Sequence, residues 1–287
     1  MQYGAVFPQT EIGSDPVVLR DLVQAIEGLG YDYLLAYDHV LGADPEGRDN
    51  VWQGTYTYRT TFHEPLTLFA YLAGLTKRIE LASGVVILPQ RQTALVAKQA
   101  AEVDLLSGGR LILGVGSGWN YVEYESLGED FRTRGRRLEE QVGLLRQLWA
   151  EPIVEFEGRF DRVPRAGINP LPGRRIPIWM GGGAAIVLDR IGRIGDGWFA
   201  GQARPELLKR DVATIHEAAR RVGRDPTEIG IASGVDVVRG SPEEQASHAA
   251  RLEAAGADRI SVITMDAGFQ TPDDHIAALQ AFRDAVT

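Results

Sequence analysis

Short apolar runs alternate with helical patterns along most of the chain. Several of the runs are continuous, which is typical of strands covered on both faces in a parallel sheet. Eight strand–helix units predict an α/β fold, a (β/α)8 TIM barrel, which uses about 250 residues as one domain. We therefore expect a single domain over residues 1–287, with strands over residues 3–7, 33–37, 79–86, 110–115, 177–180, 196–200, 230–235 and 259–264.

The stretches between the strands carry ordinary helix boundary signals. The first predicted helix, over about residues 16–29, begins at Pro16 and is followed by Gly30. Proline suits the first turn of a helix, and glycine suits the position just after its end. Further helices are predicted over about residues 64–75, 93–106, 132–149 and 184–194.

Two long segments, Leu41–Phe62 and Glu151–Arg175, interrupt the regular spacing. Long connections inside a compact domain are often functional, so we expect both to form insertion loops at the C-terminal face of the barrel or around its rim. The first follows a strand and is predicted to be a lid, unless its aromatic side chains only hold the loop in place. The second contains a predicted hairpin over residues 154–163 that turns at Gly158 and Arg159, an insertion rather than a barrel strand.

Composition narrows the class of protein. The chain is 44% hydrophobic and 24% charged, as in a soluble globular protein. It contains no cysteine, which excludes disulfides, thiol nucleophiles and cysteine-bound metals. A net charge of −9 argues against a nucleic-acid partner, and no apolar run approaches the length of a membrane span. The first residues predict a strand rather than a signal peptide, so we expect a cytoplasmic protein with a small-molecule substrate and no membrane partner.

Glycine clusters follow two of the predicted strands. Gly114-Val-Gly-Ser-Gly118 follows the fourth strand, and Gly181-Gly-Gly183 lies between the fifth strand and a helix. Bare backbone amides at such a place suit a flat or phosphorylated ligand, and a plain turn would need only one glycine. The first cluster is not a dinucleotide fingerprint, because its third glycine comes too early and Trp119-Asn-Tyr does not continue as an apolar helix.

Asp38 and His39 follow the second strand, where the active site of an α/β barrel lies. His39 is a candidate proton donor or hydrogen-bond donor to a cofactor ring, and Asp38 could set its tautomer or contact a ligand. The structural alternative is a helix-capping aspartate beside a half-buried histidine. We expect no metal site, because no metal-binding spacing occurs among the other histidines, His63, His216, His248 and His275.

Two rival barrel chemistries fit less well. A Schiff-base aldolase needs a lysine on an inner strand, whereas Lys77, Lys98 and Lys209 lie before a strand or in helices. A retaining glycosidase needs two carboxylates about 5 Å apart. That alternative stays open but explains neither glycine cluster; its candidate carboxylates near strand ends are Asp38, Asp236 and Asp266.

Four segments resemble the bacterial luciferase-like flavin monooxygenase family: Leu81–Pro89, Ala97–Trp119, Ile178–Gly183 and Asp196–Trp198. The resemblance extends from Tyr3 to about Trp198. It implies an α/β barrel that binds FMN or the deazaflavin coenzyme F420 at its C-terminal mouth. Asp38-His39 is similar to the F420-dependent branch, in which this histidine lies near the reactive carbon of the deazaflavin.

The resemblance also implies roles for particular residues. Val85, Val86 and Leu88 would back the ring, with a non-proline cis peptide between Val85 and Val86. The ribityl chain and phosphate would be held by two further segments, with cofactor-binding positions at Ser117, Gly118, Met180, Gly181, Gly182 and Gly183. Relatives are commonly dimers, so a homodimer is expected.

One position departs from the F420-dependent sugar-phosphate dehydrogenases of this branch. They carry a catalytic glutamate where this chain has Trp119, which argues against a sugar-phosphate substrate. Trp52, Trp119 and Trp198 instead predict an apolar or aromatic substrate pocket.

The resemblance and the residues together predict an F420-dependent oxidoreductase that transfers a hydride between the deazaflavin and a small organic substrate. His39 would donate a proton or hydrogen bond near the reacting centre, and Asp38 would orient it. One alternative is an FMN-dependent monooxygenase that uses reduced flavin and O2. A weaker alternative is a non-catalytic flavin-binding protein.

Overall fold

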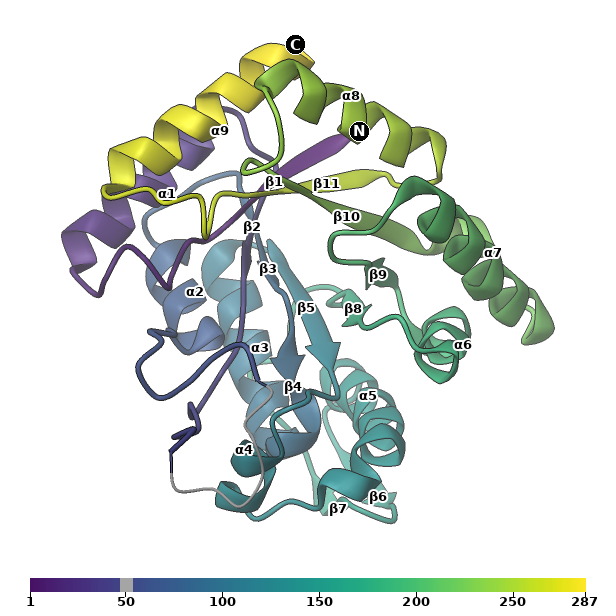
Figure 1. The fold of residues 1–287 in the computed structure, drawn as a ribbon. Coiled ribbons are helices and arrows are strands. Elements are labelled where there is room, and N and C mark those ends of the chain that lie inside the picture. Colours follow the sequence, from purple (N-terminus) through teal and green to yellow (C-terminus); the bar gives the residue numbers. More distant parts are fainter. Residues whose placement is uncertain (47–53) are drawn as a thin grey trace.

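Parallel strands form a closed barrel in the computed structural model, which describes residues 1–46 and 54–287 (Figure 1). The sheet order β3-β2-β1-β11-β10-β9-β8-β5 is closed by pairing of β3 with β5, and every pair is parallel. The predicted TIM barrel is therefore confirmed. Its strands are β1 (Gln2–Val6), β2 (Tyr33–Ala36), β3 (Glu80–Ser83), β5 (Leu111–Gly116), β8 (Ile178–Gly181), β9 (Gly197–Phe199), β10 (Gly230–Asp236) and β11 (Arg259–Ile263).

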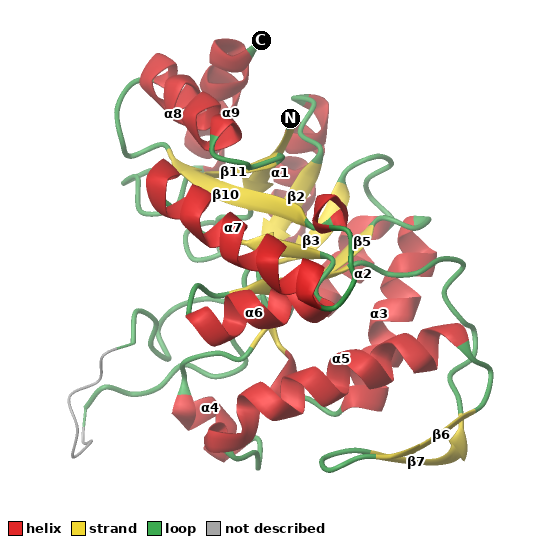
Figure 2. Cartoon of the chain, turned by 90° about the vertical axis from the view of Figure 1, so that its right-hand side faces the viewer, coloured by secondary structure: helices red, strands yellow, loops and turns green. Residues whose placement is uncertain are grey.

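Helices surround the strands on the outside (Figures 1 and 2). Proline in the first turn and a side-chain cap start several of them: the Asp15 carboxylate caps α1, and Ser241 and Thr271 form capping boxes at α8 and α9. No helix in the described residues is both long and apolar enough to span a bilayer. The helices are α1 (Pro16–Gly28), α2 (Pro65–Ala73), α3 (Thr93–Ser107), α4 (Tyr121–Ser126), α5 (Arg134–Ala150), α6 (Ala185–Ile194), α7 (Pro205–Arg221), α8 (Pro242–Ala254) and α9 (Pro272–Val286).

Alternate residues of the strands enter two different hydrophobic clusters. Leu34 joins the layer between strands and helices, whereas its neighbours Tyr33 and Leu35 join a cluster inside the barrel. Successive side chains of a strand point to opposite faces, and here both faces are buried. This arrangement explains why the strands have continuous apolar sequences. Large side chains such as Tyr33 and Trp179 belong to the interior cluster, so the barrel is a packed core and not a pore.

The third barrel strand differs from the prediction. It is divided into β3 and β4 (Val86–Ile87), and both pieces pair with β5. The non-proline cis peptide lies between Gly84 and Val85, so its predicted position between Val85 and Val86 is wrong by one residue. The backbone at Gly84 passes so close to β2 that an added Cβ would lie 2.7 Å from the Leu35 side chain. Only glycine fits the chain at this crossing.

The predicted hairpin of the second long segment is confirmed as β6 (Val154–Glu157) paired with β7 (Arg162–Ala166). None of residues 151–175 lines the central cavity described below, but the Thr93 hydroxyl at the start of α3 donates to Asp161 of this segment, so the expectation that it rims the active-site face stays a prediction. The segment follows α5 instead of a strand, and Figure 2 shows the hairpin along the outer side of that helix. The Glu140 carboxylate of α5 fixes the turn by accepting hydrogen bonds from the amides of Arg159, Phe160 and Asp161.

Candidate active site

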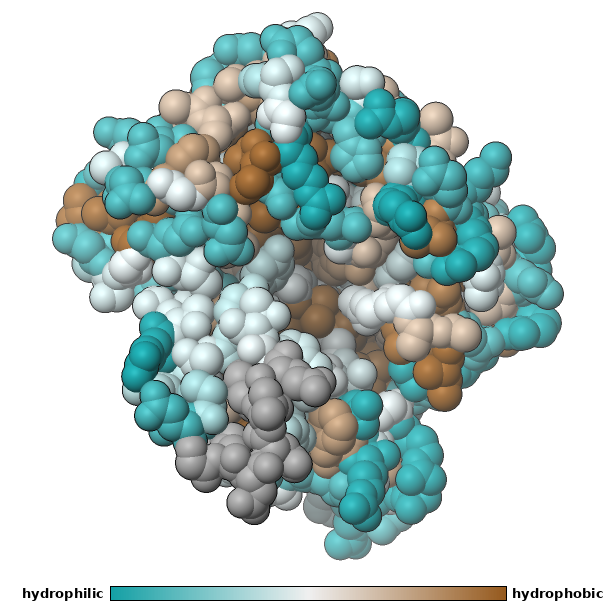
Figure 3. Space-filling model, viewed as in Figure 1, coloured by the Kyte–Doolittle hydropathy of each residue, from teal (hydrophilic) through white to brown (hydrophobic). Residues whose placement is uncertain are grey.

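A cavity of about 560 Å³ opens at the carboxyl ends of the barrel strands. Its size lies within the range of pockets that enclose small ligands and cofactors. Figure 3 shows this face hollowed at its centre, with hydrophobic surface at the bottom of the hollow. The apolar part of the wall is formed by Val6, Leu35, Val85, Ile87, Phe199, Ala200, Ala232 and Ile263.

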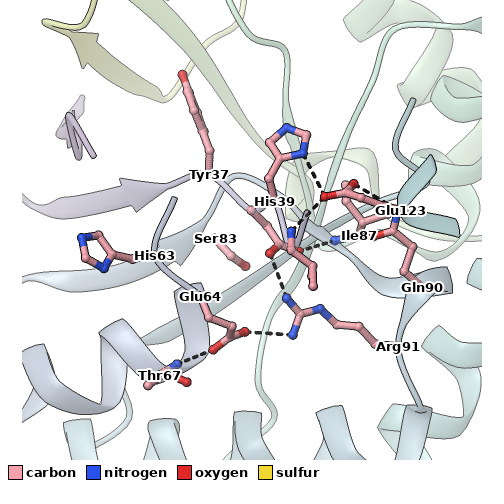
Figure 4. A network of polar contacts seen from close by, with 12 residues as sticks. Tyr37, His39, His63, Glu64, Thr67, Ser83, Ile87, Gln90, Arg91 and Glu123 are labelled. Carbon is pink, nitrogen blue, oxygen red and sulfur yellow. Dashed lines mark hydrogen bonds and ion pairs between the residues drawn. The ribbon is translucent and has the colours of Figure 1, made fainter. Parts of the chain in front are cut away.

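His39 lines this cavity and meets a buried carboxylate (Figure 4). Its Nδ1 lies 3.3 Å from Oε1 of Glu123, and the two side chains are 10% and 1% exposed. The same oxygen accepts hydrogen bonds from the amides of Val40 and Leu41, at 2.8 and 3.0 Å. Glu123 therefore fixes both the imidazole and the backbone that follows it.

The surroundings of Glu123 lower the pKa of its carboxyl and favour the ionised form. Burial by itself would raise the pKa of its carboxyl, but hydrogen bonds from His39 and the Leu41 amide outweigh that effect and hold the pKa below its usual value. An ionised carboxylate only accepts hydrogen bonds, so Nδ1 of a neutral His39 is the donor and Nε2 is left as the acceptor. The ring nitrogen opposite Glu123 can then take a proton from a bound ligand or return one.

Glu123 is not among the site residues predicted from the sequence. It lies in the first turn of α4, a short helix that was not predicted, and the Asn120 side chain caps that helix by accepting from the Val122 amide. The pattern Asn120-x-x-Glu123 matches a capping box, so it could have revealed the start of the helix. It could not have revealed His39 as the partner, because the two residues are 84 positions apart.

The prediction that Asp38 orients His39 is wrong, because the Asp38 carboxylate has other partners. Its carboxylate accepts from the Ile87 amide at 3.0 Å and from Nη2 of Arg91 at 2.8 Å. Arg91 also donates to Glu64 at 2.8 Å and so links the loop after β4 to the start of α2 (Figure 4). Burial raises the pKa of Asp38, whereas Arg91 and the Ile87 amide favour the charged form. Asp38 also borders the cavity, so the predicted ligand contact stays a prediction.

Aromatic rings surround the His39 imidazole. The ring centroids of Tyr56, Phe62 and Trp119 lie 5.2, 4.8 and 5.4 Å from that of His39, all in edge-to-face geometry. Trp119 and Tyr56 line the cavity, in agreement with an aromatic pocket. These rings shield the imidazole from water on several sides, which strengthens polar interactions inside the cavity.

A second predicted pocket tryptophan, Trp198, does not line the cavity wall. Trp198 is buried, and its Nε1 donates to the carbonyl of Gly182 at 2.8 Å. Because it faces the layer between strands and helices, it holds the glycine segment in place instead of contacting a ligand in the cavity. Trp52 lies outside the described residues.

Both predicted glycine segments meet at the cavity, where Ser117, Gly118 and residues 181–183 form part of its wall. Gly118 and Gly182 have φ values of 62° and 113°, which side chains rarely adopt. A Cβ added at Gly183 would meet no atom within 4 Å. The next residues begin α6, whose first turn has no side-chain cap. A bare, uncapped helix start beside an open cavity fits a phosphate group.

Three residues were predicted to back the coenzyme ring, and of these only Val85 lines the cavity. Val86 and Leu88 are fully buried on the other side of the strand, and Ile87 takes the position facing the cavity. Met180 is likewise buried in the outer core. The reason is the alternation of side chains along an extended strand, which gives every second residue to the opposite face. An apolar wall at Val85 and Ile87 still fits a flat ring.

Within residues 1–46 and 54–287, no group of three or more histidine and acidic side chains has the arrangement of a metal site. The polar groups at the cavity are instead a histidine held by a carboxylate, the Asp38 carboxylate, hydroxyl groups and bare backbone. Together with the apolar wall, they fit an organic cofactor with a flat ring and a phosphorylated chain.

The chain belongs to the luciferase-like monooxygenase family, whose model matches residues 5–281. Members of this family are F420- or flavin-dependent oxidoreductases and monooxygenases, and this protein is an enzyme of that kind. The fold agrees with solved structures: monooxygenase RslO1 from Streptomyces bottropensis superposes with a TM-score of 0.82 at 18% identity, over 100% of this chain and 98% of the other.

Sequence relatives include both coenzyme classes. An uncharacterised protein of Mycobacterium tuberculosis is 33% identical over 79% of this chain and 80% of its own length. The F420-dependent hydroxymycolic acid dehydrogenase of the same organism is 27% identical over 98% of this chain and 80% of its own. Pyrimidine monooxygenase RutA of Allorhizobium ampelinum is 29% identical over 72% of this chain and 56% of its own.

Proposed function

We propose that the protein is an F420-dependent oxidoreductase that transfers a hydride between the deazaflavin and a small organic substrate. The observation that carries this proposal is the position of His39, which lines the cavity with its Nδ1 on Glu123. The two glycine segments form another part of the same cavity wall. A relative that spans nearly the whole chain is named as an F420-dependent dehydrogenase. The Asp38-His39 pair, which resembles that branch, supports the same coenzyme.

The chain's own residues have separable roles. When bound, the coenzyme would supply or accept the hydride. His39 would move the accompanying proton through Nε2: it takes the proton of a substrate hydroxyl as the carbon–hydrogen bond gives up its hydride, and it returns a proton to the carbonyl oxygen in the reverse direction. Glu123 would keep the imidazole in the tautomer and orientation that this transfer requires.

Val85 and Ile87 would contact the ring of the coenzyme. Tyr56 and Trp119 line the same cavity. The phosphate of the coenzyme would lie at Gly182 and Gly183, beside the uncapped start of α6. Ser117 and Gly118 would hold the chain between ring and phosphate. These assignments rest on the bare backbone and on the apolar wall at these positions.

An FMN-dependent monooxygenase is the second candidate, supported by the relative named as a pyrimidine monooxygenase. Titration of the purified protein with F420 and with FMN, followed by fluorescence quenching, tests the choice. We expect tighter binding of F420. Micromolar binding of FMN with no F420 signal would reject the first proposal. Turnover of each reduced cofactor with and without oxygen then separates hydride transfer from oxygenation.

We also propose that the enzyme works in the cytoplasm as a homodimer. The family resemblance supports the dimer, and the composition supports the location. Analytical ultracentrifugation tests the oligomeric state, since a monomer and a dimer of a 31.4 kDa chain sediment at clearly different rates. A monomer at micromolar concentration would contradict the proposal.

A further inference from the structure

The Tyr37 side chain lines the central cavity beside His39. Tyr37 directly follows β2, and only Asp38 separates the two residues, so the alternation of side chains along an extended segment places them on the same side. Figure 4 shows both rings on one side of this segment and Arg91, the partner of Asp38, on the other. Gln9 fixes the backbone here, because its Nε2 donates to the Tyr37 carbonyl at 2.9 Å.

The Tyr37 hydroxyl has no hydrogen-bond partner within the part of the chain that the structure describes. Other tyrosines with little exposure do use their hydroxyls: Tyr31 donates to the Leu279 carbonyl at 3.0 Å, and Tyr124 donates to the Ser117 carbonyl at 2.7 Å. A tyrosine hydroxyl usually finds a partner when the ring is buried. An unpaired hydroxyl on a half-buried ring at a cavity wall therefore indicates a contact with a polar group of a ligand.

The surroundings of Tyr37 keep its hydroxyl protonated. Burial, followed by the neighbouring Tyr56 and the carboxylates of Asp236 and Asp266, raises the pKa of Tyr37. A protonated phenol can donate one hydrogen bond to an oxygen in the cavity. Tyr37 therefore offers a neutral donor, beside the histidine that is the candidate for proton transfer.

Neutral His39 cannot itself donate to an oxygen in the cavity. Its Nδ1–H is directed to Glu123, so Nε2 only accepts. A carbonyl oxygen also only accepts, and it would have no donor at this nitrogen. A hydroxyl, by contrast, can donate to Nε2 and accept from Tyr37 at the same time. The two side chains thus complement each other around a single oxygen atom.

We propose that the Tyr37 hydroxyl donates a hydrogen bond to the substrate oxygen at which His39 moves the proton. As the carbon of an alcohol gives up its hydride to the coenzyme, the O–H proton passes to Nε2 and the oxygen becomes a carbonyl that remains bonded to Tyr37. Tyr37 neither gains nor loses a proton; its donor stabilises the negative charge that develops on the oxygen. The catalytic part rests on the oxidoreductase function proposed above, whereas binding of a ligand oxygen to Tyr37 does not.

Other hydroxyls at the cavity fit this role less well. Ser233 donates to a backbone carbonyl, Ser261 shares a hydrogen bond with a buried tyrosine, and Ser117 lies on the wall assigned to the coenzyme. Tyr56 also lines the cavity, but it belongs to the long segment after β2. A side chain next to a strand end is held more precisely than one on a long loop, which favours Tyr37.

Equilibrium binding of two matched probes tests the proposal, both without coenzyme and with oxidised F420 or FMN. Acetophenone carries a carbonyl oxygen where α-methylstyrene carries a methylene group, and an oxidised coenzyme has no hydride with which to reduce the ketone. Calorimetry should show that Tyr37→Phe weakens binding of acetophenone about 2- to 10-fold, as expected for one neutral hydrogen bond. Binding of α-methylstyrene should stay unchanged, because phenylalanine keeps the ring.

Infrared difference spectroscopy of acetophenone with an isotope-labelled carbonyl carbon detects the hydrogen bond itself. In the wild type, the carbonyl stretch should lie below its frequency in an apolar solvent, because a hydrogen bond weakens the C=O bond. Tyr37→Phe should return it most of the way to that frequency. Tyr71→Phe is the control: it removes a hydroxyl of α2 that donates to the Pro16 carbonyl outside the cavity, and it should change neither affinity nor frequency.

Three outcomes would overturn the proposal: equal affinity of the wild type for the two probes, an unchanged carbonyl frequency in Tyr37→Phe, or a frequency shift that is lost only in Tyr56→Phe. Each of them leaves the proposed oxidoreductase function standing. That function fails instead if neither F420 nor FMN binds in the titration. The measurement without coenzyme would still show whether Tyr37 binds the carbonyl oxygen.

Discussion

The Nδ1 atom of His39 lies 3.3 Å from Oε1 of Glu123, a residue 84 positions further along the chain. Glu123 also accepts from the Val40 and Leu41 amides and from the Gln90 side chain, so it holds the end of β2, its following loop and the region after β4 together. One buried carboxylate thereby sets the position and the tautomer of the candidate proton-transfer residue.

Replacement of Glu123 by glutamine should lower kcat by roughly 10- to 100-fold, the loss typical of a partner that orients a functional histidine. The amide oxygen can still accept from the loop and from Nδ1, but it lacks the negative charge that would stabilise the positive charge developing on the imidazole as it takes a proton. A changed pH profile of kcat, with little change in coenzyme affinity, would separate orientation of the imidazole from a purely structural role. Glu125→Gln on the same helix is the control, since Glu125 is exposed. Equal kcat and an identical pH profile for both variants would contradict this role.

The pKa of Glu123 gives a prediction for stability. Its folded-state value lies below the ordinary value of 4.5, so the ionised carboxylate contributes stability that is fully present above that pH and is lost as the pH falls through the folded pKa. The stability difference between the wild type and Glu123→Gln should therefore shrink as the pH is lowered from 7 to 3. Urea denaturation at several pH values measures it. A constant difference across this range would contradict the lowered pKa.

Replacement of His39 by alanine should reduce turnover by roughly 10²- to 10⁴-fold if the imidazole moves a proton. The fold should survive, because the side chain borders the cavity and its removal enlarges a space that is already open. Steady-state kinetics with an established substrate, together with circular dichroism, check both parts. Unchanged turnover in a folded variant would leave His39 as a structural residue.

Gly183 offers the sharper test of the coenzyme phosphate site. Gly182→Val should weaken binding, but at φ 113° any side chain also strains the backbone. At Gly183 an added Cβ meets no atom within 4 Å, so Gly183→Val should leave thermal stability nearly unchanged. Its coenzyme dissociation constant should still rise at least about tenfold, by loss of close backbone contacts to the phosphate. Normal coenzyme binding would move the phosphate to another place, such as Ser117 and Gly118.

The ion pair between Arg91 and Asp38 predicts a large effect on stability. Arg91→Met leaves a buried carboxylate without its cation, which should cost roughly 3–5 kcal/mol of unfolding free energy. Arg162→Met removes an arginine from the exposed pair with Glu157 and should change stability by at most about 1 kcal/mol. Chemical denaturation of both variants gives the comparison. Similar losses in the two would show that the buried pair contributes little.

The sequence by itself determined the barrel and the end at which the site lies. Apolar runs of strand length, separated by capped helical patterns, leave few alternatives to parallel strands covered on both faces, and such strands bring their C-terminal residues to one rim. Asp38, His39 and both glycine segments could be placed at that rim because they directly follow strands. Signals of this kind involve residues that are close together in the chain, so they can be recognised from the sequence alone.

Only the tertiary structure decided which side chains meet there. Asp38 and His39 are adjacent, so a partnership seemed natural, yet consecutive residues of an extended chain point to opposite sides: Asp38 meets Arg91, and His39 meets Glu123. The same alternation places Ile87 at the cavity and buries Val86. Contacts between such distant segments depend on the register and packing of the closed barrel, which no local pattern specifies.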